Sequence, residues 1–293
     1  MTSAQPSIRV NVDVTNPGQF FACCGLLELA DRLWPGAEGW FERDVFCIST
    51  QKPGASLTSV IDALAEATVA NTMSADQLDR LQQLSAMSVS QRRGVPGADD
   101  EKKALESLRR ELPITLSGCI NFRIDWFLDT HAGGSRFKTW AGQQSVLDIA
   151  TSMHAACTHF VPDDDSLWFS ATAIGLPFNF DSDLGIQGSG RDIGLVFDAL
   201  AGNEITRIAV SCRPLLELLC FVGLQRFRPR EVTGHNRFIY CVWTLPLDVH
   251  VAPAAAAATI GGTWSRPYEF SLLYRTKYLK SFLPAIPSQG DLL

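Results

Sequence analysis

Residues 16–35, NPGQFFACCGLLELADRLWP, decide the fold of this chain. Apolar side chains recur along this segment at helical spacing, and Pro17 suits the first turn of a helix. The segment therefore predicts a buried helix that ends at the Trp-Pro-Gly sequence of 34–36. Residues 8–14, IRVNVDV, alternate in polarity and predict a half-buried strand before it, and residues 45–48, VFCI, predict a strand after it.

A second segment has the same organisation. Residues 212–229, CRPLLELLCFVGLQRFRP, also place a proline near the start, a cysteine and a glycine inside, and an arginine followed by a proline at the end. A predicted strand at 205–211 precedes this helix, and another at 238–244 follows it. Two related strand–helix–strand halves would explain the likeness, but any two buried helices bounded by prolines would share these features. Both explanations stay open.

Elsewhere in the chain, helices and strands follow no regular alternation. The patterns predict helices at 57–69, 75–87, 101–112 and 144–160, strand character at 114–128 and 268–283, a polar loop at 92–103 and a connector at 248–262. We therefore predict an α+β fold in which mixed sheets pack against helices. The pattern divides the chain into residues 1–128, 129–203 and 204–293, although a single domain is the alternative.

The composition excludes several classes of protein. Among 293 residues, 46% are hydrophobic and 19% are charged, which suits a chain with a large core and excludes a disordered one. No run of 18 apolar residues occurs, and the first residues lack the pattern of a secretory signal, so we expect no membrane partner. Eight cysteines without a secretory signal predict reduced thiols and a cytoplasmic location, and the absence of a CxxC pair argues against a zinc ribbon or a thioredoxin-type site.

The positive charges are concentrated in three stretches, although the chain carries a net charge of −6. Residues 204–240 hold six arginines against three glutamates, and residues 262–282 hold four basic residues against one glutamate. Residues 131–144 hold two basic residues and no acidic one. This distribution predicts one basic face on an acidic protein, which is a feature of proteins that bind nucleic acid.

The glycine-containing loop at 129–145, DTHAGGSRFKTWAGQQS, combines the side chains that such a face needs. Arg136 and Lys138 can neutralise phosphates, and Trp140 can stack on a base. Gln143 and Gln144 can read base edges through their amides. An ordinary glycine loop with a tryptophan in the core is the alternative.

Three further stretches extend the predicted interface. Residues 224–237 contain four arginines, whose planar guanidinium groups match phosphate oxygens, although a solvated charged face is the alternative. The glycine-rich loop at 185–194 lacks the Walker A and dinucleotide-binding patterns. Backbone amides beside Arg191 could hold a phosphate there, and a plain structural loop is the alternative. Basic and aromatic residues also alternate at 274–280. The residues predicted to contact nucleic acid are Arg136, Lys138, Trp140, Gln143, Gln144, Arg191, Arg226, Arg228, Arg230, Arg237, Arg275, Lys277 and Lys280.

This prediction makes a strict demand on the structure. The three basic clusters have to lie on one surface, and internal carboxylates must not occupy their charged groups. We predict no catalytic residue, metal site or cofactor, because the five histidines show no HExxH grouping and no G-x-S-x-G sequence occurs. A ribonuclease that needs no metal and uses His131 or His235 as an acid or base is the enzymatic alternative.

Three blocks of this sequence resemble a known family: VDVTNPGQFFACCGLLELADRLWPGAEGWF at 12–41, FKTWAGQQS at 137–145 and, more loosely, LLCFVGLQRFRP at 218–229. The family is CRISPR-associated, belongs to type I-G (formerly I-U) systems and is regarded as a second, shorter form of the large subunit of the effector. The resemblance implies a non-catalytic subunit of a Cascade-like complex, which would contact CRISPR RNA, target double-stranded DNA, other Cascade subunits and a helicase-nuclease recruited in trans. In such complexes the guide RNA supplies most of the sequence specificity.

Two other roles compete with this expectation. One is a ferredoxin-like endoribonuclease that processes CRISPR RNA, or a subunit that binds the end of the guide. The other is a protein–protein scaffold without direct contact to nucleic acid.

Overall fold

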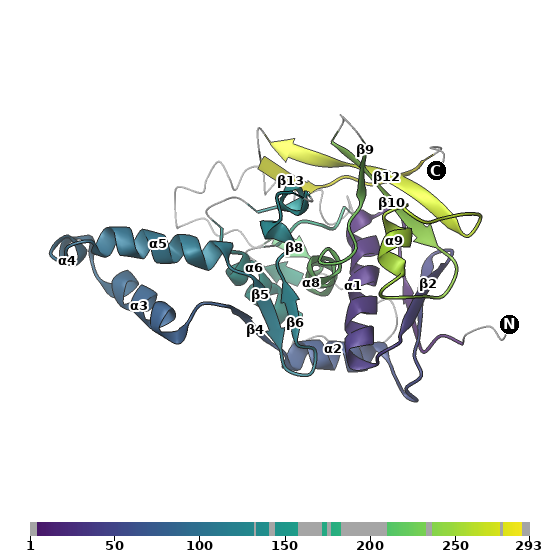
Figure 1. The fold of residues 1–293 in the computed structure, drawn as a ribbon, viewed down its shortest axis with the longest axis horizontal. Coiled ribbons are helices and arrows are strands. Elements are labelled where there is room, and N and C mark those ends of the chain that lie inside the picture. Colours follow the sequence, from purple (N-terminus) through teal and green to yellow (C-terminus); the bar gives the residue numbers. More distant parts are fainter. Residues whose placement is uncertain are drawn as a thin grey trace.

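The computed structural model describes residues 5–131, 133–140, 144–157, 172–174, 177–182, 210–232, 236–275 and 278–288. Two buried helices, α1 (Pro17–Leu33) and α8 (Pro214–Gly223), form the centre of this structure (Figure 1). Both begin with a proline, and the side chain of Asn16 caps α1 by accepting a hydrogen bond from the backbone of Gln19. These are the two helices that the apolar segments predict.

Glycines bring the two helices into backbone contact. A Cβ atom on Gly25 of α1 would lie 1.9 Å from the carbonyl oxygen of Leu219 in α8. A Cβ atom on Gly223 of α8 would lie 2.1 Å from the carbonyl oxygen of Phe21 in α1. Any larger residue at either position would therefore separate the helices, because each glycine faces the backbone of the opposite helix.

An antiparallel sheet lies beside α1. It contains β1 (Ile8–Asn11), β2 (Glu38–Glu42), β3 (Val45–Ser49) and β11 (Leu247–Asp248), in the order β1-β3-β2-β11. The two-residue turn between β2 and β3 places Arg43 at a φ of 59°. The sequence pattern did not predict β2. This strand follows directly after the predicted end of the helix, and its polar and glycine residues are typical of a loop.

A second antiparallel sheet covers the other side of the core. It contains β9 (Arg230–Val232), β10 (Arg237–Trp243), β12 (Ser265–Arg275), β13 (Tyr278–Phe282) and β14 (Ile286–Pro287), with β14 paired to β12. The predicted strand at 268–283 is therefore wrong as a single element, since the chain reverses direction between β12 and β13.

Aromatic side chains join the two sheets to the central helices. The ring of Phe20 on α1 stacks on Tyr240 of β10 at 4.2 Å between centroids. The hydroxyl of Tyr240 donates to the carbonyl of Val14, and the indole N–H of Trp243 donates to the carbonyl of Gly39, each at 2.7 Å. Residues from 1–128 and from 204–293 thus share one core.

A helical arm leaves this core between two paired strands. The three-stranded sheet has the order β4 (Thr68–Asn71), β5 (Ile114–Ser117), β6 (Phe122–Ile124), and the arm between β4 and β5 consists of α3 (Ala75–Ala86), α4 (Val89–Arg93) and α5 (Ala98–Glu111). Figure 1 shows the arm in blue, projecting from the rest of the molecule.

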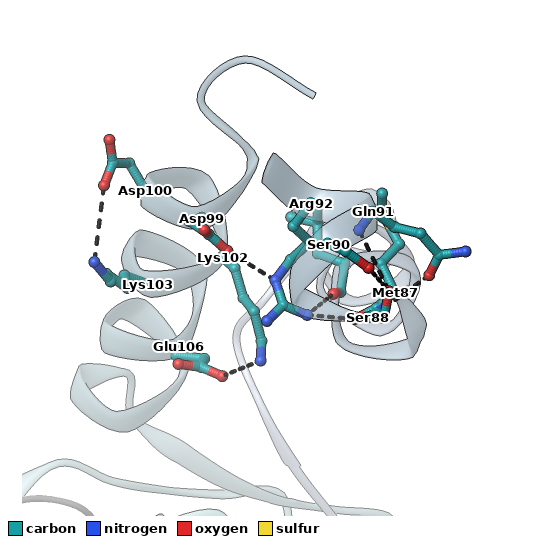
Figure 2. Close-up of polar contacts among 11 residues, drawn as sticks. Met87, Ser88, Ser90, Gln91, Arg92, Asp99, Asp100, Lys102, Lys103 and Glu106 are labelled. Carbon is teal, nitrogen blue, oxygen red and sulfur yellow. Dashed lines mark hydrogen bonds and ion pairs between the residues drawn. The ribbon is translucent and has the colours of Figure 1, made fainter. Parts of the chain in front are cut away.

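Arg92 holds the tip of the arm together (Figure 2). Its Nε donates to the carboxylate of Asp99 on α5 at 2.8 Å, and its Nη1 donates to the carbonyls of Leu84 and Met87 on the other side. The predicted loop at 92–103 is therefore wrong in part, because α5 already begins at Ala98. Gly97 precedes it in a left-handed conformation, and three acidic residues in the first turn favour a helix start.

The remaining elements complete an α+β fold, which confirms the predicted class, with all strand pairs in the described residues antiparallel rather than mixed in direction. They are α2 (Leu57–Glu66), the 3-10 turns η1 (Trp126–Leu128) and η2 (Gly134–Phe137), α6 (Val146–Cys157), β7 (Thr172–Ile174), β8 (Val210–Cys212) and α9 (Ala252–Ala256). The helix predicted at 57–69 ends at Glu66, where the chain turns into β4, and the predicted connector at 248–262 contains α9. In the described part of the chain, no helix combines the length and apolar character needed to cross a bilayer.

Candidate nucleic-acid interface

The loop that carries Arg136 and Lys138 is anchored to the end of α8. The side-chain oxygen of Gln225 accepts hydrogen bonds from the backbone N–H groups of Asp125 and Trp126 at 2.8 and 3.0 Å. Gly134 packs so closely that a Cβ atom there would lie 2.1 Å from the carbonyl oxygen of Trp126. Gly134 therefore allows the loop to pack against the backbone of Trp126. The segment before the loop is held by Gln225, which is about 100 residues away in the sequence.

Arg136 connects this loop to the second basic stretch. Its guanidinium forms an ion pair with Glu231 on β9, donates to the side-chain oxygen of Asn236 at 3.1 Å and lies 5.7 Å from the ring centroid of Phe238. Tyr274, near the end of β12, lies within the electrostatic influence of Arg136 and Glu231. Burial is the main cause that raises the pKa of the Tyr274 hydroxyl, while Arg136 lowers it.

The structure brings two of the three predicted basic clusters into contact. Arg136 of the first cluster contacts Glu231, Asn236 and Phe238 of the second, and Phe137 packs against Phe238 and Phe282 beneath them. Of the third cluster, Tyr274 lies within the electrostatic influence of Arg136, whereas the side chains of Arg275, Lys277 and Lys280 lie outside the described residues. The first demand, one surface for all three clusters, therefore stays a prediction.

The prediction also required that no internal carboxylate pairs with the arginines of these clusters. The structure contradicts this, because four of their guanidinium groups form ion pairs with carboxylates. Arg136 pairs with Glu231 as described, Arg226 with Glu28 at 2.7 Å, Arg228 with Asp129 at 2.7 Å and Arg237 with Glu269 at 2.7 Å. The expectation of free arginine groups is thus corrected for all four. The physical reason is that folding places acidic residues distant in sequence beside each arginine, which lowers the cost of bringing the charges close to the core.

These pairs differ in how readily a phosphate could replace the carboxylate. Glu28 is buried and also accepts a hydrogen bond from Arg32 at 3.2 Å, so the contact of Arg226 is structural. Arg136 and Arg237 instead have side chains that are 37% and 42% exposed. Exposed ion pairs contribute only about 0–1 kcal/mol, so a phosphate can compete for these two arginines.

Other predicted contacts are placed less favourably. The ring of Trp140 packs against Trp126, Phe127, Phe178 and Phe221, with centroid distances between 5.4 and 6.2 Å. Trp140 is half-buried at the edge of the core, which favours the alternative of a tryptophan in the core over a base-stacking platform. The ammonium of Lys138 lies 5.8 Å from the ring centroid of Phe127.

Of the remaining predicted residues, the structure describes only some. Gln144 lies half-buried just before α6, and the Nε of Arg230 is buried without a hydrogen-bond partner among the described residues. Gln143, Arg191, Lys277 and the side chains of Arg275 and Lys280 lie outside the described residues, as does His235. His131 is exposed at the start of the loop.

A buried polar cluster that sequence reasoning missed lies at the N-terminal ends of α1 and α8. Glu217 of α8 accepts backbone hydrogen bonds from Phe180 and Asp181 at 3.0 and 2.9 Å. The carboxylate of Asp181 accepts from Asn16 at 2.6 Å and from Arg213 at 3.1 Å. Burial raises the pKa of Glu217 to about 8. A glutamate within the apolar run PLLELLCFVG was the available signal for this cluster.

Among the described residues, we find neither an activated cysteine nucleophile nor a group of metal ligands. Burial raises the pKa of the Cys23, Cys24 and Cys220 thiols well above its usual value, so these thiols stay protonated. Within the described ranges, no three histidine, cysteine, aspartate or glutamate side chains are grouped so that they could hold a metal ion.

The candidate interface thus centres on Arg136, with Arg228, Lys138 and Tyr274 around it. The Arg237–Glu269 pair is close in sequence but lies on the opposite face of the sheet formed by β9, β10 and β12. No protein-family model, curated protein sequence or solved structure matches this chain.

Proposed function

We propose that this chain is a non-catalytic, nucleic-acid-binding subunit of a type I CRISPR surveillance complex. In this role it would act in the cytoplasm, bind the guide RNA and the target DNA, contact other Cascade subunits and support a helicase-nuclease recruited in trans. The observation that supports the proposal is the contact, around Arg136, between two basic segments that are about 100 residues apart in sequence, with Tyr274 of a third segment nearby. The resemblance of three sequence blocks to the shorter large-subunit family gives the proposal its biological setting.

The proposed contact is an exchange of partners. A phosphate that approaches Arg136 or Arg237 would replace the carboxylate of Glu231 or Glu269 and gain two parallel hydrogen bonds from a planar guanidinium. The displaced carboxylates are partly exposed, at 44% for Glu231 and 18% for Glu269, so water can solvate them. Such contacts hold the backbone of the nucleic acid and leave sequence reading to base pairing with the guide.

The double variant Arg136→Ala/Arg237→Ala tests this proposal. We expect it to weaken the binding of a fluorescently labelled single-stranded RNA about tenfold, because two phosphate contacts are lost. The slope of log K against log salt should fall by up to about one for each lost contact. Fluorescence anisotropy titrations between 50 and 300 mM salt would measure both quantities, with a labelled DNA duplex as a second probe.

The matched control is Arg9→Ala/Arg80→Ala, which removes two arginines from exposed ion pairs with Glu42 and Glu101 outside the candidate interface. This control should bind like the wild type. Equal affinity and equal salt slope in both double variants would refute the assignment of phosphate contacts to Arg136 and Arg237. Arg226 is left out of the test because its loss would remove a partner from the buried Glu28.

A further inference from the structure

An open pocket of about 610 Å³ lies at the opposite end of β12 from the candidate interface. Its walls come from the chain after β1, the turn between β2 and β3, the start of α1 and the start of β12. Arg266 in the pocket and Tyr274 at the interface are eight residues apart on β12, which corresponds to about 26 Å, and the Arg237–Glu269 pair lies on the opposite face of the sheet from Arg266. The pocket is therefore a separate place on the molecule.

Two arginines line this pocket, and they differ from those of the interface. Arg43 and Arg266 are both exposed, and neither guanidinium forms a hydrogen bond or an ion pair with any described residue. Arg136, Arg228 and Arg237, by contrast, have carboxylate partners. Two guanidinium groups that share a pocket and have no internal partner form a place where an anion can bind.

The backbone at Arg43 supports a role for its side chain. Arg43 is the first residue of a two-residue hairpin turn and has a φ of 59°, a region that favours glycine. A residue with a Cβ atom costs free energy in this conformation, and strain of this kind concentrates at binding sites. The turn thus places an arginine on the pocket at the expense of local stability.

The other polar groups in the pocket select among anions. The carboxylate of Asp13 accepts two hydrogen bonds from Thr15, at 2.9 and 2.7 Å, and Asp44 adds a second, exposed carboxylate. These acceptors would repel a small multivalent anion that carries no donors. They would instead accept hydrogen bonds from the hydroxyls of a sugar, and the ring of Tyr268 provides an apolar wall. A volume of this size suits a ligand with a phosphate, a ribose and a base.

We propose that this pocket binds a nucleoside phosphate, with Arg43 and Arg266 on the phosphate and Asp13 or Asp44 on the ribose hydroxyls. The ligand is either a free nucleotide or the terminal nucleotide of an RNA strand, which present the same chemistry. The inference does not depend on the proposed function, because none of these residues belongs to the interface around Arg136.

Isothermal titration calorimetry of the full chain with AMP tests the proposal. Wild-type protein should bind AMP saturably and bind adenosine at least tenfold more weakly, since adenosine lacks the phosphate. Arg43→Gly and Arg266→Gln should each weaken AMP binding about tenfold or more. Arg43→Gly should also keep or raise the melting temperature, because glycine adopts the left-handed turn without strain. The control Arg9→Gln removes an exposed arginine of β1 that lies outside the pocket lining and should leave AMP binding unchanged.

The affinity for a short RNA, measured with and without a 5′ phosphate, distinguishes a free nucleotide from the terminal nucleotide of a strand. Stronger binding of the phosphorylated RNA, lost in Arg43→Gly, would identify a strand terminus, whereas AMP binding without this difference would identify a free nucleotide. The proposal is overturned if the wild type shows no saturable AMP binding, or if both pocket variants bind AMP like the wild type. Arg136→Ala/Arg237→Ala should retain AMP binding, so this result is independent of the interface.

Discussion

Gly25→Ala is expected to cost the protein about 3 kcal/mol or more of its free energy of unfolding, which places it at the severe end of overpacking substitutions. The added methyl group would lie 1.9 Å from the carbonyl oxygen of Leu219, a distance at which backbone has to move. No flexible side chain can yield there, so α1 and α8 must separate and expose the aromatic residues packed on them. Gly223→Ala should behave in the same way, since its Cβ atom would meet the carbonyl oxygen of Phe21.

Thermal unfolding followed by circular dichroism would measure this effect. For a chain of 293 residues, a loss of 3 kcal/mol lowers the melting temperature by about 5 °C. Gly94→Ala is the matched control, because its Cβ atom would lie 3.3 Å from the carbonyl oxygen of Gln91 at the tip of the arm. If Gly25→Ala melts within 2 °C of the wild type, the close contact of the two central helices is wrong.

Glu217→Ala is expected to cost about 2–5 kcal/mol, because it leaves two buried backbone N–H groups without their acceptor. These N–H groups belong to Phe180 and Asp181, whose segment crosses the ends of both central helices. A Cβ atom on Gly18 would lie 2.6 Å from the carbonyl oxygen of Phe180, so this segment packs directly on α1. Loss of the acceptor should therefore loosen the N-terminal ends of α1 and α8 together.

The raised pKa of Glu217 also gives a pH dependence with a definite sign. In the folded protein burial raises this pKa from 4.5 to about 8, so the folded state holds a proton that the unfolded chain releases above pH 4.5. The stabilisation is complete below pH 4.5 and is lost as the pH rises to about 8, with a slope of at most about 1.4 kcal/mol per pH unit. Asp181 is the charged group that acts on Glu217 and raises its pKa further, and the carboxylate of Asp181 is itself paired with Arg213.

Urea unfolding of the wild type and of Glu217→Gln at pH 5 and pH 8 would test this dependence. Glutamine stays neutral and keeps one oxygen acceptor, so the variant should lose less stability than the wild type between the two pH values. Parallel losses in both proteins would show that Glu217 does not titrate in this range.

The local pattern of the sequence was sufficient to predict the central helices and the α+β class. The apolar spacing of residues 16–35 and 212–229 and the alternation of residues 8–14 are properties of neighbouring residues, and burial in one core preserves them. The likeness of the two helices also pointed to their glycines, although the pattern could not show that Gly25 and Gly223 face each other. Whether the two halves are related by duplication stays a prediction.

The charge state of the interface could not be predicted from local sequence. Arg226 is separated by 198 residues from its partner Glu28, and Arg228 by 99 residues from Asp129. A count of charges within a stretch of 30 residues cannot detect such partners, so the stretch looks basic although folding neutralises much of it. The pocket could not be predicted for the same reason. Arg43 and Arg266 are isolated in the sequence and line one pocket only after β2, β3 and β12 have assembled.

The central claim is that the basic segments around Arg136 contact nucleic acid. Photo-crosslinking of the full chain to an RNA that carries 4-thiouridine, followed by mass spectrometry of the crosslinked peptides, tests it most directly. The account predicts crosslinks in residues 133–140, 226–240 and 269–275, with the arm at 75–111 as an internal control that stays free. Crosslinks confined to the arm, or spread evenly over all these segments, would contradict it.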